Sequence, residues 1–506
     1  MAHPPHDAAV DLLIVGGGIN GTGIARDAAG RGLSVLLAER DDLASHTSSA
    51  STKLIHGGLR YLEYGEFRLV REALVERERL LAIAPHIIWP LRLVLPQTQS
   101  PRPAWMVQLG LFLYDHLGGR ETLPGTQTVR LDASPLGEGL SRRDGKAFVY
   151  SDCWVDDSRL VVLNALDAAE RGATIATRTR LVTAERESGG WIATLQGQRG
   201  TRMVRARALV NAAGPWVTDV LGRVAGAHAK GRVRLVKGSH IVVPRLYLGE
   251  HAFMLQNGDR RIVFAIPYEG SFTLVGTTDV AWSDAPATVS ISEDETAYLL
   301  ETIARYFARR VRADEIVWSY AGIRPLHDDR AASASAVTRD YVLEIDTLGG
   351  EAPMLSIFGG KITTYRKLAE HALRQLAPFL PASRAAWTAD TALPGGDMPD
   401  QDFPAFLARL ETERPALPRP LLRRLARAYG TRVERLLGTA RKLGDLGPDL
   451  GGGLTGAEVD YLVDTEWAQT SDDVLFRRSK LGLHVPPGTV ERLGAYLAGC
   501  VPPAGR

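Results

Sequence analysis

The chain has 506 residues, of which 45% are hydrophobic and 23% are charged. This length exceeds one compact core, so two or three domains are expected, and the composition excludes a disordered chain and a polytopic membrane protein. The 60 Lys and Arg residues nearly balance the 58 Asp and Glu residues, so the net charge predicts no nucleic-acid partner.

Cysteine usage and the N-terminal segment indicate a cytoplasmic protein. Cys153 and Cys500 are far apart and have no metal-ligand spacing, so neither a disulfide framework nor a metal site is expected. The first ten residues lack the basic and apolar regions of a secretory signal. No apolar run reaches the length of about 18 residues that a spanning helix needs, so any membrane contact is expected at the surface.

The first elements form a β–turn–α–β unit, with strands at 11–14 and 34–38 and a helix at 20–31. The segment Gly16-Gly17-Gly18-Ile19-Asn20-Gly21 satisfies GxGxxG between the first strand and the helix. Such glycines let the backbone approach a pyrophosphate, which the helix N-terminus attracts. Glu39 ends the second strand, where a carboxylate can bind ribose hydroxyls, and Arg40 follows it. The unit predicts dinucleotide binding.

The remaining elements follow in chain order. Hydrophobic periodicity predicts helices at 67–81 and 156–171 and an apolar segment at 105–117. It also predicts strands at 173–176 and 208–211, a hairpin at 187–200 and mostly strands from 240 to 280. Pro and Gly residues predict a linker at 394–396, and a helical region follows it.

Two distant segments favour FAD over NAD as the dinucleotide. Val210-Asn211-Ala212-Ala213-Gly214-Pro215-Trp216 resembles the strand-to-turn motif of the D-amino-acid-oxidase-type flavoproteins. Phe358-Gly359-Gly360-Lys361 opens a helix and offers a second N-terminus to the flavin or the pyrophosphate. An ordinary turn is the alternative interpretation of this Gly pair.

Longer motifs narrow the resemblance. The segment from Thr47-Ser48-Ser49-Ala50-Ser51-Thr52-Lys53 through Leu54-Ile55-His56-Gly57-Gly58-Leu59-Arg60-Tyr61-Leu62 resembles the signature of FAD-dependent glycerol-3-phosphate dehydrogenases. Further matching motifs are Tyr150-Ser151-Asp152-Cys153-Trp154-Val155-Asp156-Asp157, Lys237-Gly238-Ser239-His240, Gly276-Thr277-Thr278-Asp279, Gly322-Ile323-Arg324-Pro325-Leu326, Thr338-Arg339-Asp340-Tyr341 and Lys361-Ile362-Thr363-Thr364-Tyr365-Arg366-Lys367. The resemblance covers essentially the whole chain.

The resemblance implies an α/β + α fold of three domains. A discontinuous, Rossmann-like FAD-binding domain is expected at 1–75, 145–232 and 330–385. A substrate-binding or cap domain with an antiparallel sheet is expected at 76–144 and 233–329. A C-terminal helical domain is expected at 394–506.

The resemblance also implies a cofactor site. The residues expected to bind FAD are Gly16, Gly17, Gly18, Ile19, Asn20, Gly21, Glu39, Arg40, Thr47, Ser48, Ser49, Thr52, Lys53, Leu54, His56, Gly57, Ala213, Gly214, Trp216, Gly359, Gly360, Lys361, Ile362 and Thr363. A Ser-rich loop alone would indicate only flexibility, but the place of this one before the His56 turn favours flavin contact.

The expected substrate is sn-glycerol 3-phosphate, which needs a cationic cradle for its phosphate and a group that takes the C2 hydroxyl proton. Arginine suits phosphate because its fork donates two hydrogen bonds. The residues expected to bind substrate are Arg60, Tyr61, Arg324, Arg339 and Lys361, although a solvated cation is the alternative for each of the basic residues.

His56 is the first candidate for general base and His240 the second, since an imidazole titrates near working pH. Either histidine can instead be a structural residue. Arg324 is expected to assist catalysis by stabilising developing negative charge. The resemblance places Lys361 close to the flavin and substrate as a further catalytic residue.

One apolar segment suggests how the protein meets a membrane. Within 101–117, Trp105, Leu109, Phe112 and Leu113 fall on one helical stripe, so this helix can lie in the membrane interface. A buried core helix is the alternative interpretation. The basic stretch at 419–442 either adds attraction to anionic lipid or is a solvated helix face.

The resemblance implies that electrons pass to a membrane quinone and that the protein attaches peripherally to the inner face of the cell membrane. A homodimer is expected. The competing hypotheses are an FAD oxidase that uses dioxygen, acting on the same substrate or on a small amino acid, and a non-catalytic flavin-binding sensor.

Overall fold

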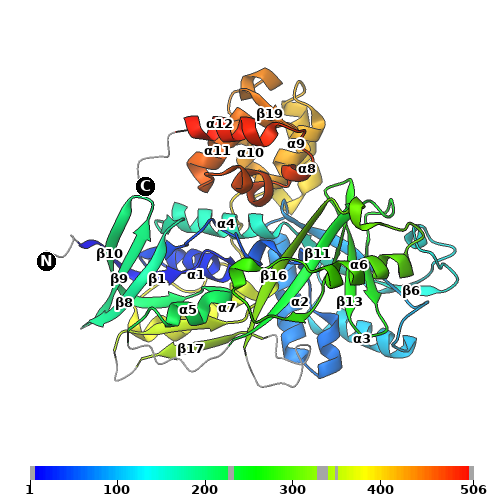
Figure 1. The fold of residues 1–506 in the computed structure, drawn as a ribbon, viewed down its shortest axis with the longest axis horizontal. Coiled ribbons are helices and arrows are strands. Elements are labelled where there is room, and N and C mark those ends of the chain that lie inside the picture. Colours follow the sequence, from blue (N-terminus) through cyan, green and yellow to red (C-terminus); the bar gives the residue numbers. More distant parts are fainter. Residues whose placement is uncertain (1–5, 188, 226–232, 328–339, 348–350, 501–506) are drawn as a thin grey trace.

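The computed structural model describes residues 6–187, 189–225, 233–327, 340–347 and 351–500. It contains two large sheets and a lobe of helices, which lies above both sheets in Figure 1. The predicted fold class, α/β with a C-terminal helical domain, is confirmed.

The first sheet has the strand order β17-β18-β10-β1-β2-β7, with β9 added beside β10 and β8 beside β9. Its centre is parallel, as a Rossmann-like unit requires, because β1 pairs in parallel with both β2 and β10. Strand β10 pairs with β9 through its first half and with β18 through its end. The strands are β1 (His6–Val15), β2 (Val35–Ala38), β7 (Thr174–Ala176), β8 (Arg180–Glu187), β9 (Gly190–Gly197), β10 (Gly200–Asn211), β17 (Val342–Asp346) and β18 (Met354–Phe358).

Helix α1 (Ile19–Gly30) packs between α4 (Asp157–Glu170) and α7 (Tyr365–Leu376). Small residues permit this close packing, since a Cβ at Gly23 would lie 2.6 Å from the Tyr365 ring. Arg26 of α1 donates to Asp167 of α4 at 2.6 Å, so the charge buried between these helices is paired. This packing holds the N-terminus of α1 in a fixed place at the carboxyl end of β1, in the centre of the first sheet.

The second sheet has the order β15-β11-β14-β13-β12-β4-β6-β3, with β16 beside β11 and β5 beside β6. It is antiparallel except where β12 pairs with β4. The strands are β3 (Leu54–Ile55), β4 (Ile88–Pro96), β5 (Gln127–Arg130), β6 (Lys146–Val155), β11 (Val233–Pro244), β12 (Ala252–Gln256), β13 (Ile262–Tyr268), β14 (Phe272–Gly276), β15 (Val280–Ala281) and β16 (Trp318–His327).

Alternating apolar residues give this sheet two buried faces. Leu93 and Leu95 face a core shared with α2 (Phe67–Ile83) and α3 (Ala104–Leu117), whereas Val94 faces the core beneath α6 (Glu293–Tyr306). A period-two pattern with both faces buried therefore places helices on either side of the sheet.

Sheet membership differs from the expected domain boundaries in two places. Strands β3 and β6 lie in segments expected for the FAD-binding domain, but both belong to the second sheet. The reason is pairing: β6 runs beside β4 from Ile88 to Pro96, a contact that no local pattern reveals. The division into domains otherwise remains a prediction.

The C-terminal lobe has its own core, formed by α8 (Phe403–Glu413), α9 (Arg419–Tyr429), α10 (Val433–Leu437), α11 (Gly456–Glu466) and α12 (Thr489–Gly499), with a small sheet of β19 (Asp449–Gly451) and β20 (Leu454–Thr455). A π-helical turn spans Asp473–Arg478. Short helix α5 (Val217–Leu221) belongs to the first sheet's layer.

The segment expected as a linker is tightly packed. A Cβ at Gly395 would lie 2.2 Å from the Tyr429 carbonyl oxygen, and one at Gly396 would lie 2.2 Å from the Ile83 carbonyl oxygen. The Arg159 guanidinium on α4 also pairs with both oxygens of Glu466 on α11, and both side chains are buried. The lobe is therefore joined to the rest of the chain by close backbone contact and buried charge.

Candidate active site

In the glycine-rich turn after β1, one glycine allows close packing and another lines an open cavity. A Cβ at Gly21 would lie 1.9 Å from the Gly16 carbonyl oxygen, so Gly21 allows the close contact between helix and strand. Among the residues that the structure describes, a Cβ at Gly18 would meet only Ser48 Oγ within 4 Å, at 3.1 Å. Gly18 lines a cavity of about 780 Å³ at the N-terminus of α1. The turn thus leaves room where a pyrophosphate needs it.

Glu39 is held at the wall of this cavity by two backbone donors. Its Oε2 accepts from Gly17 N at 2.6 Å, and its Oε1 accepts from Asp41 N at 2.8 Å. Burial raises the pKa of Glu39, and these two N–H groups act against that rise. The carboxylate therefore lies at the end of β2, where ribose hydroxyls are expected.

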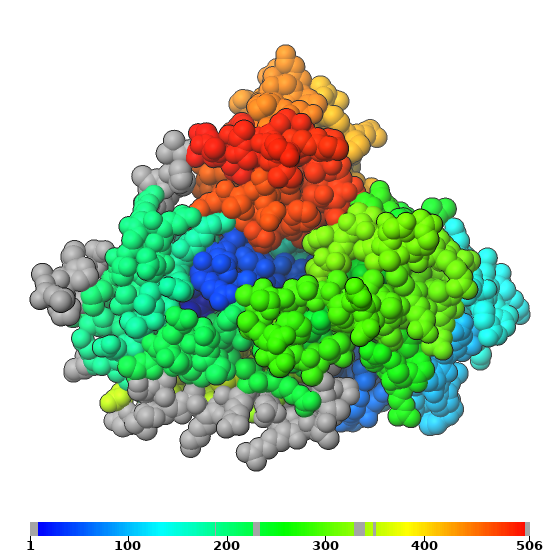
Figure 2. Space-filling view, viewed as in Figure 1, coloured from blue at the N-terminus to red at the C-terminus, as the bar shows by residue number. Residues whose placement is uncertain are grey.

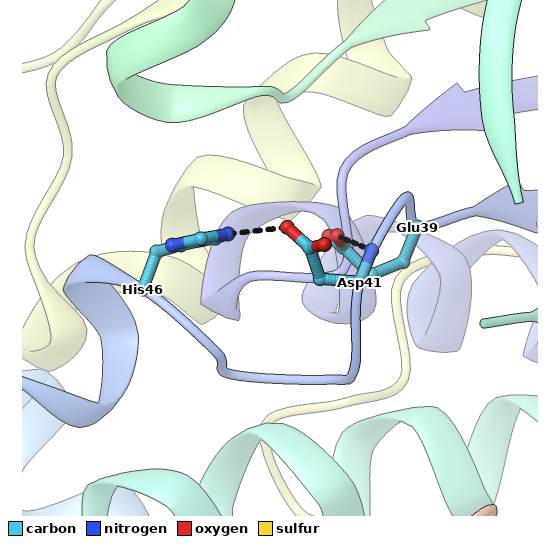
Figure 3. A group of neighbouring side chains, drawn as sticks. All are labelled: Glu39, Asp41 and His46. Carbon is cyan, nitrogen blue, oxygen red and sulfur yellow. Dashed lines mark hydrogen bonds and ion pairs between the residues drawn. The ribbon is translucent and has the colours of Figure 1, made fainter. Parts of the chain in front are cut away.

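Glu39, Asp41 and His46 form a cluster, shown in Figure 3, of the kind that can bind a metal ion. The carboxylate oxygens and the imidazole nitrogen that could serve as ligands lie within 4.8 Å of one another. His46 Nε2 lies 2.7 Å from Asp41 Oδ2, and this hydrogen bond contributes most to lowering the pKa of Asp41 to about 2. Both Glu39 oxygens already accept N–H groups, and all three residues line the 780 Å³ cavity. We therefore assign the cluster to the wall of the cofactor cavity.

Trp216 gives this cavity an aromatic surface. The Arg40 guanidinium lies 4.0 Å from the centre of its ring, and the His46 ring lies 4.5 Å away. In Figure 2 the N-terminal segment is visible in a hollow bordered by residues near 200 and near 290 and by the C-terminal lobe. Predicted cofactor residues that line this cavity are Gly16, Gly18, Ile19, Asn20, Glu39, Arg40, Thr47, Ser48, Ala213, Gly214, Trp216, Gly359 and Gly360.

A second cavity, of about 350 Å³, adjoins the first. The two share lining residues at Ile19, Thr47-Ser48 and Gly359-Gly360, so a flavin ring that leaves the first cavity would enter the second here. Predicted site residues that line the second cavity are Thr52, Leu54, His56, Arg60, Tyr61, Arg324, Lys361, Ile362 and Thr363. At this junction Asn20 Nδ2 donates to the carbonyl oxygen of Gly359, a residue 339 positions away in the sequence.

Three cations of the described residues face the second cavity. Arg324 pairs with Asp279 and donates to Thr277 Oγ1 at 2.9 Å. The Lys361 ammonium lies 3.9 Å from the centre of the Tyr61 ring. Arg60 Nε is buried without a hydrogen-bond partner among the described residues. An anionic group in this cavity would find donors that the protein itself leaves available at Arg60.

The two candidate bases differ in their access to this cavity. His56 lines it, and its backbone N donates to Thr363 Oγ1 at 3.3 Å. His240 lines neither cavity and stacks on Tyr320 with centroids 4.8 Å apart, and its Nε2 lies 3.0 Å from Oγ1 of Thr52, which does line the second cavity. Burial, then Arg324 and Lys53, hold the pKa of His240 well below its usual value. This geometry argues against His240 as the proton acceptor.

Several predicted cofactor residues have other contacts. The Lys53 ammonium is fully buried against Asp157, at 2.8 and 2.9 Å from the carboxylate oxygens, and lines neither cavity. Ser49 Oγ donates to the His46 carbonyl at 3.1 Å, and Gly57 N donates to Tyr114 Oη at 2.7 Å. For Lys53 the prediction of a side chain directed at the flavin is wrong, because the ion pair holds it inside the protein. Arg339 lies outside the described residues.

Sequence reasoning missed part of both cavity walls. Tyr150, Met254 and Phe264 line the second cavity from β6, β12 and β13. Arg178 and Thr179 line the first from the segment between β7 and β8. Strands were expected from 240 to 280, but not at β6, and which of their alternating faces meets the cavity depends on the pairing of the whole sheet.

Comparison with known proteins agrees with this geometry. Residues 11–366 match the model of the FAD dependent oxidoreductase family, and residues 386–494 match the C-terminal domain of alpha-glycerophosphate oxidase. The chain is 56% identical over 489 residues to a glycerol-3-phosphate dehydrogenase of Pseudomonas aeruginosa, covering 96% of this chain and 94% of that one. It is 54% identical over 487 residues to a D-erythritol 1-phosphate dehydrogenase of Brucella abortus, covering 96% of each chain.

Among solved structures, the glycerol-3-phosphate dehydrogenase of Bacillus halodurans complexed with FAD aligns with a TM-score of 0.74 and 28% identity, covering 94% of this chain and 86% of that one. The glycine turn, the Glu39 carboxylate and the open face of Gly18 fit the same cofactor. The chain belongs to the family of FAD-dependent oxidoreductases and, within it, to the FAD-dependent glycerol-3-phosphate dehydrogenases.

Proposed function

We propose that the chain oxidises sn-glycerol 3-phosphate to dihydroxyacetone phosphate and passes the electrons to a membrane quinone. One observation carries this proposal: the cavity that holds His56, Arg60, Arg324 and Lys361 joins the cofactor cavity at Gly359-Gly360. A small anionic alcohol bound there would lie beside the flavin. Relatives that are more than half identical over nearly their whole length, one of them named a glycerol-3-phosphate dehydrogenase, support the same reaction.

The residues that line the substrate cavity have separate roles in this oxidation. FAD, when bound, supplies the acceptor for the hydride that leaves C2. His56 takes the proton of the C2 hydroxyl, so that hydride and proton leave the same alcohol and a ketone forms. Arg60 and Lys361 bind the phosphate, and Tyr61 supports Lys361 through its ring face. Arg324 is oriented by Asp279 and Thr277 and stabilises the charge that develops on the substrate oxygen.

Helix α3 supports attachment at a membrane surface. Its Val107, Leu111 and Tyr114 are buried, whereas the outward Trp105, Leu109 and Phe112 are 68%, 52% and 58% exposed. Both interpretations of the sequence therefore apply to one helix: one face is core and the other is an apolar surface suited to a lipid interface. No helix in the described part of the chain is long and apolar enough to cross a bilayer.

A second substrate has a specific observation in its favour. The Brucella abortus relative, 54% identical to this chain, is named a D-erythritol 1-phosphate dehydrogenase. The substrate cavity of about 350 Å³ is large compared with the one additional CHOH group of that substrate. A phosphate cradle at Arg60 and Lys361 would serve either polyol phosphate.

A second acceptor also has an observation in its favour, because the matched C-terminal domain takes its description from an oxidase. The test is turnover of both polyol phosphates with a short-chain quinone under argon, compared with peroxide release in air. We expect a higher kcat/KM for glycerol 3-phosphate, quinone reduction under argon and little peroxide. Stoichiometric peroxide without quinone reduction would contradict the proposed acceptor, and a higher kcat/KM for erythritol phosphate would contradict the proposed substrate.

A further inference from the structure

A buried chain of hydrogen bonds ends on the turn that carries the proposed base. The Gly57 backbone N–H donates to Tyr114 Oη at 2.7 Å, and the Tyr114 hydroxyl donates to Asp152 Oδ1 at 2.7 Å. Arg77 Nη1 donates to the same Asp152 oxygen at 2.8 Å. Tyr114, Asp152 and Arg77 are 3%, 1% and 4% exposed, so this series of hydrogen bonds is shielded from water.

These groups come from separate elements. Tyr114 belongs to α3, Arg77 to α2 and Asp152 to β6, and the backbone N–H that donates to Tyr114 lies in the His56-Gly57-Gly58 turn. Burial raises the pKa of Tyr114 well above its usual value, so its hydroxyl remains a donor to Asp152 and its oxygen an acceptor for Gly57. The Gly57 N–H and the Arg77 guanidinium can only donate, so the hydrogen-bond directions at the two ends of this network are fixed.

Steric contact holds the turn against the same tyrosine. A Cβ at Gly57 would lie 2.5 Å from Leu74 Cδ2 and 2.8 Å from Tyr114 Cε2. The Tyr114 ring also meets Tyr150, which lines the substrate cavity, edge to face with centroids 5.7 Å apart. Tyr114 itself lines neither the substrate cavity nor the cofactor cavity.

We propose that Tyr114 is a positioning residue for the reaction, holding the His56-Gly57-Gly58 turn through the Gly57 amide so that the His56 imidazole faces the substrate. The peptide plane after His56 is the one that Tyr114 holds, so its rotation would turn the imidazole away from the hydroxyl proton. A misplacement of about 1 Å at a reacting group costs on the order of a hundredfold in rate. The inference rests on the proposed function, in which His56 takes that proton.

The test is Tyr114→Phe, studied as the FAD-loaded protein by anaerobic stopped flow with sn-glycerol 3-phosphate. Tyr306→Phe is the matched control, since Tyr306 is also buried and donates to the Gln256 carbonyl in the core beneath α6. For Tyr114→Phe we expect flavin reduction to slow by about ten- to a hundredfold. The substrate Kd, FAD content and Tm should stay close to those of Tyr306→Phe.

Two results would overturn the inference. One is a rate of flavin reduction within about twofold of wild type. The other is a joint loss of FAD, Tm and rate, which would make Tyr114 a general support of the fold. Should Tyr114→Phe fail to fold, amide exchange in the wild-type protein decides, because the inference requires the Gly57 N–H to exchange only with global unfolding. If sn-glycerol 3-phosphate does not reduce the wild-type flavin, the proposed function fails instead.

Discussion

The Asp42 carboxylate accepts hydrogen bonds from both Nη atoms of Arg478, at 2.7 and 2.8 Å. Asp42 follows Glu39 and Asp41 at the wall of the cofactor cavity, whereas Arg478 ends the π-helical turn of the C-terminal lobe. Both side chains are essentially inaccessible, and Arg477 Nε also donates to Asp42 at 2.7 Å. The lobe thus holds in place the segment that is expected to bind the adenosine end of the cofactor.

Asp42→Asn should weaken both the Asp42–Arg478 ion pair and FAD retention. Removing one partner of a buried ion pair costs about 3–5 kcal/mol because it leaves the other charge uncompensated. We expect a lower Tm and a higher Kd for FAD in reconstitution of the apoprotein. Glu413→Gln is the control, since the exposed Arg409–Glu413 pair should contribute only about 0.2–1 kcal/mol. Wild-type FAD affinity in Asp42→Asn would show that the lobe does not support the cofactor cavity.

Two alanine substitutions in the glycine turn should give different outcomes. Gly18→Ala places its Cβ at the cofactor cavity, 3.1 Å from Ser48 Oγ, so the protein should fold but purify without yellow colour. Gly21→Ala places its Cβ 1.9 Å from the Gly16 carbonyl oxygen, so it should destabilise the fold itself. Flavin absorbance and Tm together distinguish the two effects. Full flavin occupancy in Gly18→Ala would contradict the placement of the pyrophosphate.

Arg60→Ala should reduce kcat/KM for glycerol 3-phosphate about ten- to a hundredfold, because hydrogen bonds to charged groups contribute roughly 1.5–3 kcal/mol. Arg60→Lys should recover part of this loss, since an ammonium keeps the charge but not the guanidinium fork. Flavin content should not change, because Arg60 lies outside the glycine turn. Arg71→Ala, on the exposed side of α2, is the control. An unchanged kcat/KM in Arg60→Ala would exclude Arg60 from phosphate binding.

The outward face of α3 can be tested with Leu109→Glu combined with Phe112→Glu. Burial of a large apolar side chain contributes on the order of 1.5–3 kcal/mol, so two carboxylates there should release the protein from lipid vesicles. Dye-linked turnover should persist, since neither side chain lines the substrate cavity. Leu248→Glu is the control, because Leu248 is 74% exposed between β11 and β12. Unchanged co-sedimentation of the double variant would exclude this face.

The sequence predicted the features that local chemistry determines. The strand, glycine turn and helix near Gly18 are within a few residues of one another, and the apolar stripe of α3 follows from helical periodicity alone. His240 and Lys53 show the limit of that reasoning. Each lies in a motif with suitable chemistry, but burial by Tyr320 and Asp157 directs it away from the cavities.

Long-range pairing was beyond the reach of the sequence. Asp42 and Arg478 are 436 positions apart, and nothing in either segment marks the other as its partner. Tyr114 was expected only as part of an apolar helix, yet its hydroxyl meets the backbone of Gly57, 57 positions earlier. Such contacts depend on how the sheets and helices assemble, which periodicity does not specify.

The most direct test of the proposed reaction is anaerobic titration of the purified, FAD-loaded protein with sn-glycerol 3-phosphate, followed by the visible flavin spectrum and by assay of the product. The proposed reaction predicts that the flavin absorbance bleaches and that dihydroxyacetone phosphate forms in equal amount, while glycerol without phosphate bleaches it far more slowly. If sn-glycerol 3-phosphate leaves the flavin spectrum unchanged under argon, that result would contradict the proposed oxidation of this substrate.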